Sequence, residues 1–219
     1  MNFMNSSFSH PVIIRDFGIC SWSYIFNNMN HFTNVRNQHT IDEIWFVEHY
    51  PVYTNGQIGN SEFRSSIHNI PVIPTNRGGK ITYHGPGQQI VYLLFNLKRL
   101  KINIRRLLSF IEKIVLNTLY VFSIIGNNNI NPGIYVENKK ICSIGLRIKK
   151  YYCLHGFSLN IKMDLRPFKY IDPCGDKNII MTHMYNIKKN ISFHNVKNVL
   201  IKNCISFFNL TCVSIQDVY

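Results

Sequence analysis

A cysteine in a tight turn is the first candidate for chemistry in this sequence. Cys174 lies between a proline and a glycine within residues 171–176, IDPCGD, and this composition predicts a turn with a partly exposed thiol. A nearby cation would lower the pKa of such a thiol and make it a nucleophile. The candidate cations are Lys140, His84 and His155. The alternative is a cysteine that occupies a tight turn without a chemical role.

A glycine-rich segment covers residues 77–88. Its sequence, RGGKITYHGPGQ, holds four glycines and a proline between two apolar segments, which predicts a loop. Glycines let backbone N–H groups approach a ligand closely, and this favours a binding role. The alternative is a plain turn between strands, with Arg77 and His84 in solvent. The segment contains neither GxxxxGK[ST] nor GxGxxG, so it is not a nucleotide phosphate loop.

Two further segments carry glycines inside strand patterns. Gly145 lies in KICSIGLRI at 140–148, and Gly156 lies in HGFSLNI at 155–161. A glycine within a strand marks the close approach of a ligand or of another backbone. At the start of the first segment, Lys140 could point inward or to solvent. His155, taken alone, is more typical of a hydrogen-bonded core histidine than of a catalyst.

The remaining cysteines give no second site. They form no CxxC pair, and no histidine stands at zinc-ligand spacing, so no metal site is expected. We expect each of them to be a small buried hydrophobic residue; these are Cys20, Cys142, Cys153, Cys204 and Cys212.

Composition limits the class of protein. The chain has 219 residues, of which 46% are hydrophobic; this is enough for a core and excludes overall disorder. The 24 Lys and Arg against 11 Asp and Glu give a net charge of +13. The cations form only short, separated groups, so an acidic protein partner, or an AT-biased genome that enriches Ile, Asn and Lys, explains the charge better than nucleic acid. With no apolar run near ~18 residues and no signal peptide, we expect a cytoplasmic protein that binds no membrane.

Apolar periodicity predicts a single α+β domain, residues 1–219, with a mixed β-sheet and packed helices. Helical spacing indicates one helix capped by Ser21, one that starts after Asn103 and ends at Gly126, and one capped by Ser192. Strand patterns occupy 41–47, 52–53, 70–74, 89–97, 134–136, 141–148, 157–161 and 211–215. Strands and helices do not alternate strictly, which argues against a doubly wound fold.

Five motifs, taken together, resemble the lipoyl(octanoyl) transferase family. They are EHYPVYTNGQ at 48–57, RGGKITYHGPGQ at 77–88, KICSIGLRI at 140–148, HGFSLNI at 155–161 and DPCG at 172–175. The resemblance implies a biotin/lipoate-protein-ligase-like fold and no cofactor. It also implies transfer of an octanoyl group from octanoyl-acyl carrier protein to the lysine of a lipoyl domain, through an acyl-cysteine thioester, as the first step of protein lipoylation. The implied acceptors are 2-oxoacid dehydrogenase E2 subunits and the glycine cleavage H protein.

The resemblance assigns residues as well. Cys174 is the implied nucleophile and Lys140 its assistant, with backbone N–H groups of the glycine-rich segments as candidates to bind the oxyanion. The implied substrate contacts are Arg77, Gly78, Gly79, Lys80, Ile81, Thr82, Tyr83, His84, Ser143, Ile144, Gly145, Gly156, Phe157 and Ser158.

Some positions depart from the family pattern. Tyr151 stands where glycine is usual, Leu93 and Asn96 replace a common proline and aspartate, and residues 176–182 match loosely. These departures bear on details of the acyl tunnel and of partner docking. Two alternatives stay open: an ATP-dependent lipoate ligase of the same fold, which needs no nucleophilic cysteine, and a protein that only binds nucleic acid or lipoyl domains.

Overall fold

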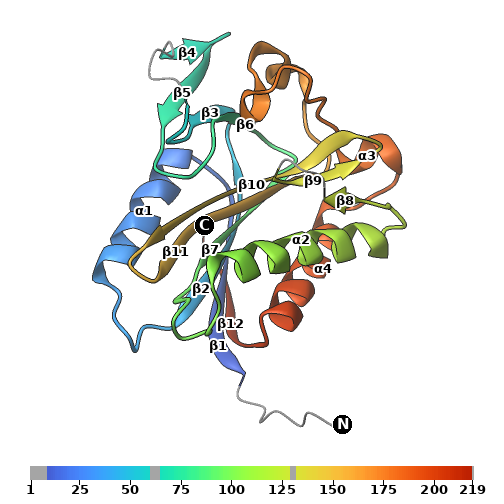
Figure 1. Ribbon diagram of the computed structural model, residues 1–219. Coiled ribbons are helices and arrows are strands. Elements are labelled where there is room, and N and C mark those ends of the chain that lie inside the picture. Colours follow the sequence, from blue (N-terminus) through green and yellow to red (C-terminus); the bar gives the residue numbers. More distant parts are fainter. Residues whose placement is uncertain (1–8, 60–64, 129–131, 219) are drawn as a thin grey trace.

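An eight-stranded mixed sheet forms the centre of the molecule (Figure 1). The structure, a computed structural model, describes residues 9–59, 65–128 and 132–218. In spatial order the strands are β12 (Leu210–Asp217), β1 (His10–Cys20), β2 (Asp42–His49), β7 (Gln88–Leu94), β11 (Tyr152–Asn160), β10 (Lys139–Lys149), β9 (Ile134–Val136) and β8 (Asn127–Asn128). β1 pairs in parallel with β12 and β2, whereas β7 pairs antiparallel with β2 and β11. This confirms the predicted mixed sheet.

Helices cover both faces of this sheet. α2 (Ile104–Val121) and α4 (Phe193–Phe207) pack together and share one core with Ile44 and Phe46 of β2. α1 (Trp22–Val35) packs with Trp45 and Val47, the alternate residues of the same strand. Successive side chains of a strand point to opposite faces, so a central strand between two helical layers is apolar throughout. All residues of β7 are buried, as the apolar run over residues 90–94 predicts, and this includes the two glutamines at its start, Gln88 and Gln89.

A second, smaller sheet lies at one end of the large one, at the top of Figure 1. Its strands, in the order β4-β5-β3-β6, are β4 (Ser66–Ile67), β5 (Ile70–Pro74), β3 (Val52–Asn55) and β6 (Ile81–His84). A third apolar core joins this sheet to the 3-10 helix η1 (Arg166–Tyr170) through contacts such as Tyr83 with Phe168, whose ring centroids lie 5.5 Å apart. Two short elements follow, η2 (Pro173–Gly175) and α3 (Met184–Ile187).

The three predicted helix caps are confirmed. Ser21 Oγ accepts from the Tyr24 N–H at 3.3 Å, and Asn103 Oδ1 accepts from the Arg106 N–H at 2.9 Å. Ser192 Oγ likewise accepts from the N–H three residues along, at 3.4 Å. Each cap satisfies a backbone donor that the first helical turn leaves unpaired.

The predicted end of the second helix at Gly126 was wrong, because α2 ends at Val121. Ser123 adopts a left-handed conformation with φ +58°, and the Ile124 N–H then donates to Leu119 O at 3.0 Å. This reversal buries Ile124 against the helix, so an apolar contact ends the helix before the glycine is reached.

Four strands were not predicted: β1, β6 and the two-residue strands β4 and β8. β1 occupies residues for which the sequence pattern predicts no element, and the predicted loop over 77–88 was wrong for its central part, where Ile81–His84 forms β6. Its partner strand β3 supplies the pairing, which the local sequence does not contain. No helix in the described ranges is both long and apolar enough to cross a membrane.

Burial of the cysteines is only partly as predicted. Cys142, Cys153 and Cys204 are buried, but Cys20 and Cys212 are half-buried, so the prediction for those two was wrong. Both lie on strands, β1 and β12, that form the outer part of the large sheet. All five of these thiols are free.

Candidate active site

A cavity of about 610 Å³ lies between the glycine-rich segment and the β10–β11 hairpin. It is of the size that holds small ligands in proteins. Among its lining residues are all of the implied substrate contacts except Tyr83. Lys140, Gly175 and Asp176 line it as well. Segments from four distant parts of the chain therefore meet at one space.

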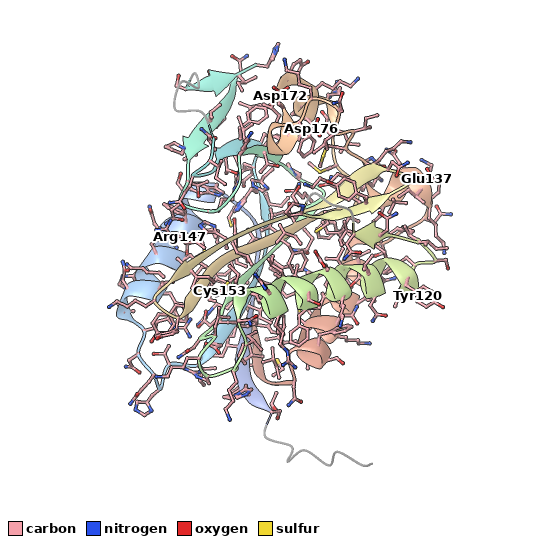
Figure 2. The ribbon with its side chains drawn as sticks, viewed as in Figure 1. Tyr120, Glu137, Arg147, Cys153, Asp172 and Asp176 are labelled. Atoms are coloured by element: carbon pink, nitrogen blue, oxygen red, sulfur yellow. The ribbon has the colours of Figure 1, made fainter. Side chains whose placement is uncertain are left out.

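The turn that carries Cys174 opens on this cavity. Cys174 is the central residue of η2, between Asp172 and Asp176, which are labelled in Figure 2. Gly175 has φ +76°, a left-handed conformation that favours glycine, and the Lys80 side chain lies against it. Because Gly175 and Asp176 both line the cavity, the backbone of the turn borders it. The Cys174 side chain lies outside the described part of the structure.

Lys140 points inward, into the cavity. It is only 1% exposed, and its ammonium donates to Pro132 O at 2.8 Å and lies 5.6 Å from the Tyr135 ring centroid. β10 starts just after a tight turn at Glu137 and Asn138, whose φ angles of +50° and +63° are those of a type I′ hairpin turn. Figure 2 shows Glu137 and Arg147 toward opposite ends of this strand. The strand thus carries one buried cation near its start.

The two candidate histidines are neutral at pH 7. Burial lowers the pKa of His84 to about 3, with a further contribution from nearby His49, and burial likewise lowers the pKa of His155 to about 3. His155 is held at Nε2, 2.6 Å from Asn76 Oδ1. Neither ring can act as the cation beside the thiol, which leaves Lys140 of the three candidates. The exposed Lys80, against Gly175, is a second ammonium at the turn.

Arg77 belongs to the wall of the cavity. Its guanidinium donates to Thr54 Oγ1 at 2.8 Å, to Thr54 O at 2.6 Å and to Gly78 O at 3.0 Å. His84 is 7% exposed. The alternative in which Arg77 and His84 are solvated turn residues was therefore wrong. The Gly78 N–H donates to Leu146 O at 2.9 Å, so this N–H joins the wall to β10 and is not a donor for an oxyanion.

The two strand glycines are register partners with different surroundings. Gly145 of β10 pairs with Gly156 of β11. A Cβ on Gly156 would collide with the Val91 carbonyl oxygen of β7, whereas a Cβ on Gly145 would lie 3.2 Å from Arg77 Cδ at the cavity. Gly156 thus marks the approach of another backbone, and Gly145 keeps the space between two cavity walls open.

Several lining residues were not predicted, and Tyr83 lies elsewhere. Tyr83 packs in the third core, 5.4 Å from the Tyr53 ring. The unpredicted lining is mostly apolar and comes from distant elements: Trp22, Ile58, Ile90, Tyr92, Ile104, Leu108, Pro132, Leu146 and Ile179. Ile90, Tyr92 and Leu108 follow the patterns of ordinary core residues, and Ile58 and Pro132 lie in turns that carry no motif, so no sequence signal marks them as lining.

The three departures from the family pattern lie away from the cavity. Tyr151 is 61% exposed in the turn between β10 and β11, and Leu93 is buried in the main core. Asn96 Oδ1 accepts from the N–H groups of Lys98 and Arg99 at 3.1 and 3.2 Å, a turn contact that an aspartate would also make. None of these three residues lines the cavity, whereas Asp176 and Ile179 of the loosely matching segment 176–182 do. In the described residues no group of three His, Cys, Asp or Glu is arranged to hold a metal ion.

Comparison with known proteins gives the family. Residues 27–205 match the family model described as the lipoyl protein ligase A/B catalytic domain. A protein named octanoyltransferase, from Buchnera aphidicola subsp. Acyrthosiphon pisum, is 48% identical over 204 residues, which cover 93% of this chain and 97% of that protein. The chain belongs to the octanoyltransferase family. An octanoyltransferase of Escherichia coli O17:K52:H18 is 42% identical over 203 residues, covering 92% of this chain and 95% of the relative.

Solved structures share the fold of this octanoyltransferase family member. A structure from the lipoylation system of Thermoplasma acidophilum, a bi-partite lipoate protein ligase and its E2 lipoyl domain, has a TM-score of 0.71 at 12% identity and covers 95% of this chain and 86% of that one. Biotin protein ligase from Aquifex aeolicus, in complex with biotin and ATP, has a TM-score of 0.53 at 12% identity, covering 92% and 71%. The predicted biotin/lipoate-protein-ligase-like α+β fold is confirmed.

Proposed function

We propose that this transferase moves an octanoyl group from octanoyl-acyl carrier protein to the lysine of a lipoyl domain, with residues 1–219 as a single catalytic domain. One observation carries the proposal: the buried ammonium of Lys140 and the turn that bears Cys174 border the same, largely apolar cavity. The names of the relatives support the octanoyl group. The acyl carrier protein as donor and the thioester on Cys174 are parts of the proposal.

In the first step the Cys174 thiolate attacks the carbonyl carbon of the donor thioester. The bond from the Cys174 sulfur to that carbon forms, and the bond from the carbon to the donor sulfur breaks, with the released thiol taking a proton. A buried ammonium stabilises a neighbouring thiolate, and Lys140 is the buried ammonium of this cavity. Donor and product are both thioesters, so this step is close to balanced in free energy.

In the second step the amine of the lipoyl-domain lysine attacks the acyl group on Cys174. The carbon–nitrogen bond forms, the bond to the Cys174 sulfur breaks, and the amine loses a proton. Lys140, neutral after it has passed its own proton to the leaving thiol, accepts that proton as general base. The covalent intermediate divides one transfer between two large proteins into two simpler steps.

The cavity lining suits an unbranched apolar chain. Side chains such as Ile90, Ile144 and Phe157 border the cavity beside the polar groups at the Cys174 turn. Each methylene buried there contributes ~0.8 kcal/mol, so the lining gives a basis for preferring one chain length. The net charge of +13 favours association with acidic partner proteins without nucleic acid.

An ATP-dependent ligase is the second candidate, because the Aquifex aeolicus biotin protein ligase of the same fold binds ATP. The two reactions are separated by purified wild-type protein and an apo lipoyl domain. One mixture contains octanoyl-acyl carrier protein without ATP, and the other contains free octanoate with ATP. We expect modification of the domain in the first mixture alone, and its loss in Cys174→Ala and Lys140→Ala. Modification only in the second mixture, retained in Cys174→Ala, would establish the ligase.

A further inference from the structure

Six hydrogen bonds connect Arg77, in the wall of the cavity, to Lys140, and of the residues between them only His84 lines the cavity. In order they run from Arg77 Nη2 to Thr54 Oγ1 (2.8 Å), Thr54 Oγ1 to His84 Nε2 (3.2 Å), His84 Nδ1 to Gln88 Oε1 (2.7 Å), Gln88 Nε2 to Asn160 Oδ1 (2.8 Å), Asn160 Nδ2 to Thr182 O (2.9 Å) and the Thr182 N–H to Lys140 O (2.8 Å).

In this hydrogen-bonded chain, which runs from Arg77 to Lys140, every donor faces the Lys140 end. Thr54 Oγ1 accepts from the Arg77 guanidinium, so its own hydrogen is directed to His84 Nε2. The proton of the neutral His84 ring is then on Nδ1, and it needs the oxygen of the Gln88 amide as acceptor. That orientation turns the Gln88 amide nitrogen toward Asn160 and fixes the Asn160 amide in turn.

Gln88 and Asn160 are the middle of the chain, and neither lines the cavity. They are register partners on the neighbouring strands β7 and β11, and each is 1% exposed. A buried amide that loses its hydrogen-bond partner destabilises the fold, which favours this one arrangement of the hydrogen-bonded chain. This holds the main chain at Thr182, only eight positions after Cys174.

The last hydrogen bond connects the fixed main chain at Thr182 to Lys140. The Thr182 N–H donates to Lys140 O, and the Lys140 N–H donates to Ile180 O, both at 2.8 Å. The N–H and the C=O of Lys140 are therefore both bound by residues 180–182, where the Asn160 amide binds Thr182 O. The Asn160 side chain acts on the position of the ammonium without touching the cavity.

We propose that Gln88 and Asn160 are positioning residues, which set Lys140 and the Cys174 turn at a fixed distance from the substrate-binding wall. This inference rests on the proposed function of Lys140 and Cys174. A displacement of about 1 Å in a reacting group costs on the order of 10²-fold in rate. Loss of this series of hydrogen bonds therefore lowers turnover without removing any group that contacts substrate.

The test uses two variants and a matched control. Asn160→Leu and Gln88→Met interrupt the chain on its two strands with side chains of similar size. Asn203→Leu is the control, because Asn203 is also a buried asparagine with two side-chain hydrogen bonds, to Asn117 and Thr118 at 2.9 Å, between α2 and α4. Thermal melting measures the loss of stability, which we expect to be similar for Asn160→Leu and Asn203→Leu.

The decisive reading is the pH profile of Cys174 alkylation by iodoacetamide, followed by peptide mass mapping. Asn160→Leu, Gln88→Met and Asn203→Leu replace none of the titratable groups that line the cavity, which are Arg77, Lys80, His84, Tyr92, Lys140, His155 and Asp176. We expect the profile of Asn160→Leu and of Gln88→Met to move toward that of Lys140→Ala, with about 10²-fold slower turnover, and the Asn203→Leu profile to stay at wild type. In the Lys140→Ala background Asn160→Leu should add no further shift, because both changes act through one group.

Three results overturn the inference. The first is that Asn160→Leu and Gln88→Met, both folded, keep the wild-type alkylation profile and a turnover within twofold of wild type. The second is that Asn203→Leu shifts the profile as much as they do. Either result removes the positioning role and leaves the proposed function intact. If Lys140→Ala itself leaves the Cys174 profile unchanged, the proposed function of the pair fails and the inference fails with it.

Discussion

Alanine at the two paired strand glycines should have opposite consequences for stability and for catalysis. Both Gly145 and Gly156 line the cavity and face each other across β10 and β11. The added methyl of Gly156→Ala meets the Val91 carbonyl, which is backbone of the central strand β7. The methyl of Gly145→Ala meets the flexible Arg77 side chain at 3.2 Å.

The expected loss of stability depends on whether the group that the added methyl contacts can move. β7 is bound on one side by β2 and on the other by β11, so overpacking at Gly156 reaches the upper part of its usual 1–3 kcal/mol, about 2–3 kcal/mol. For a chain of this size this lowers the melting temperature by roughly 4–12 °C. At Gly145 the tight contact with Arg77 is offset by the ~0.4–1 kcal/mol that alanine gains over glycine in a permitted backbone conformation.

Measurements of thermal melting and of turnover on the two variants test this difference. We expect Gly156→Ala to melt well below wild type. Gly145→Ala should melt within about 4 °C of wild type and lose roughly tenfold to a hundredfold in turnover, because its methyl displaces the acyl chain. Equal melting temperatures for the two variants, or full turnover in Gly145→Ala, would refute the division of roles between the glycines.

Three other perturbations test separate parts of the structure. Lys140→Met removes a buried charge and keeps its volume, so we expect lost turnover with an unchanged or higher melting temperature; a clear drop in melting temperature would contradict this. Asp42→Ala leaves the buried Arg36 guanidinium without its ion pair and should cost about 3–5 kcal/mol in urea unfolding, whereas a loss below ~1 kcal/mol would show that the pair is dispensable. Acidification from pH 7 to pH 5 should lower the melting temperature, because histidines whose pKa is lowered by burial bind protons only when the chain unfolds. The free energy of unfolding is therefore at its full value above pH 6.5, and below that pH it falls by up to about 1.4 kcal/mol per histidine and per pH unit. A melting temperature that does not change over this range would contradict the assignment of neutral His49, His84 and His155.

The parts of the fold that could be predicted from the sequence are those with local causes. Ser21, Asn103 and Ser192 cap their helices through N–H groups three residues away, and the Glu137–Asn138 turn closes a hairpin of adjacent strands. β7 could be predicted because burial on both faces leaves an apolar run over residues 90–94, which follows the two glutamines at its start.

The remaining features depend on partners that are distant in sequence. β6 forms because β3 pairs with it, so a glycine-rich segment contains a strand. Gly156 carried two possible meanings, and only the position of Val91 decides between a backbone contact and a ligand. Trp22 and Ile104 line the cavity from two separate helices, and their spacing is that of ordinary helix core residues.

The features of the candidate site likewise include some that the sequence reveals and some that depend on other parts of the fold. The glycine-rich segment, the Cys174 turn and Lys140 were visible as departures from the composition of the chain. The inward direction of Lys140 was not, because a lysine after a hairpin turn is exposed in most proteins. Its burial follows from the Pro132 carbonyl and the Tyr135 ring that surround its ammonium, and both belong to the preceding strand and its approach.

The central claim is the acyl-enzyme on Cys174, and intact mass tests it most directly. Wild type, Cys174→Ala and a Cys142→Ala control are mixed with octanoyl-acyl carrier protein, and an apo lipoyl domain is added after the first spectrum. We predict one octanoyl group on wild type and on the Cys142→Ala control, none on Cys174→Ala, and complete discharge of the adduct when the domain becomes modified. An octanoyl adduct on Cys174→Ala, or transfer to the domain by that variant at the wild-type rate, would contradict the claim.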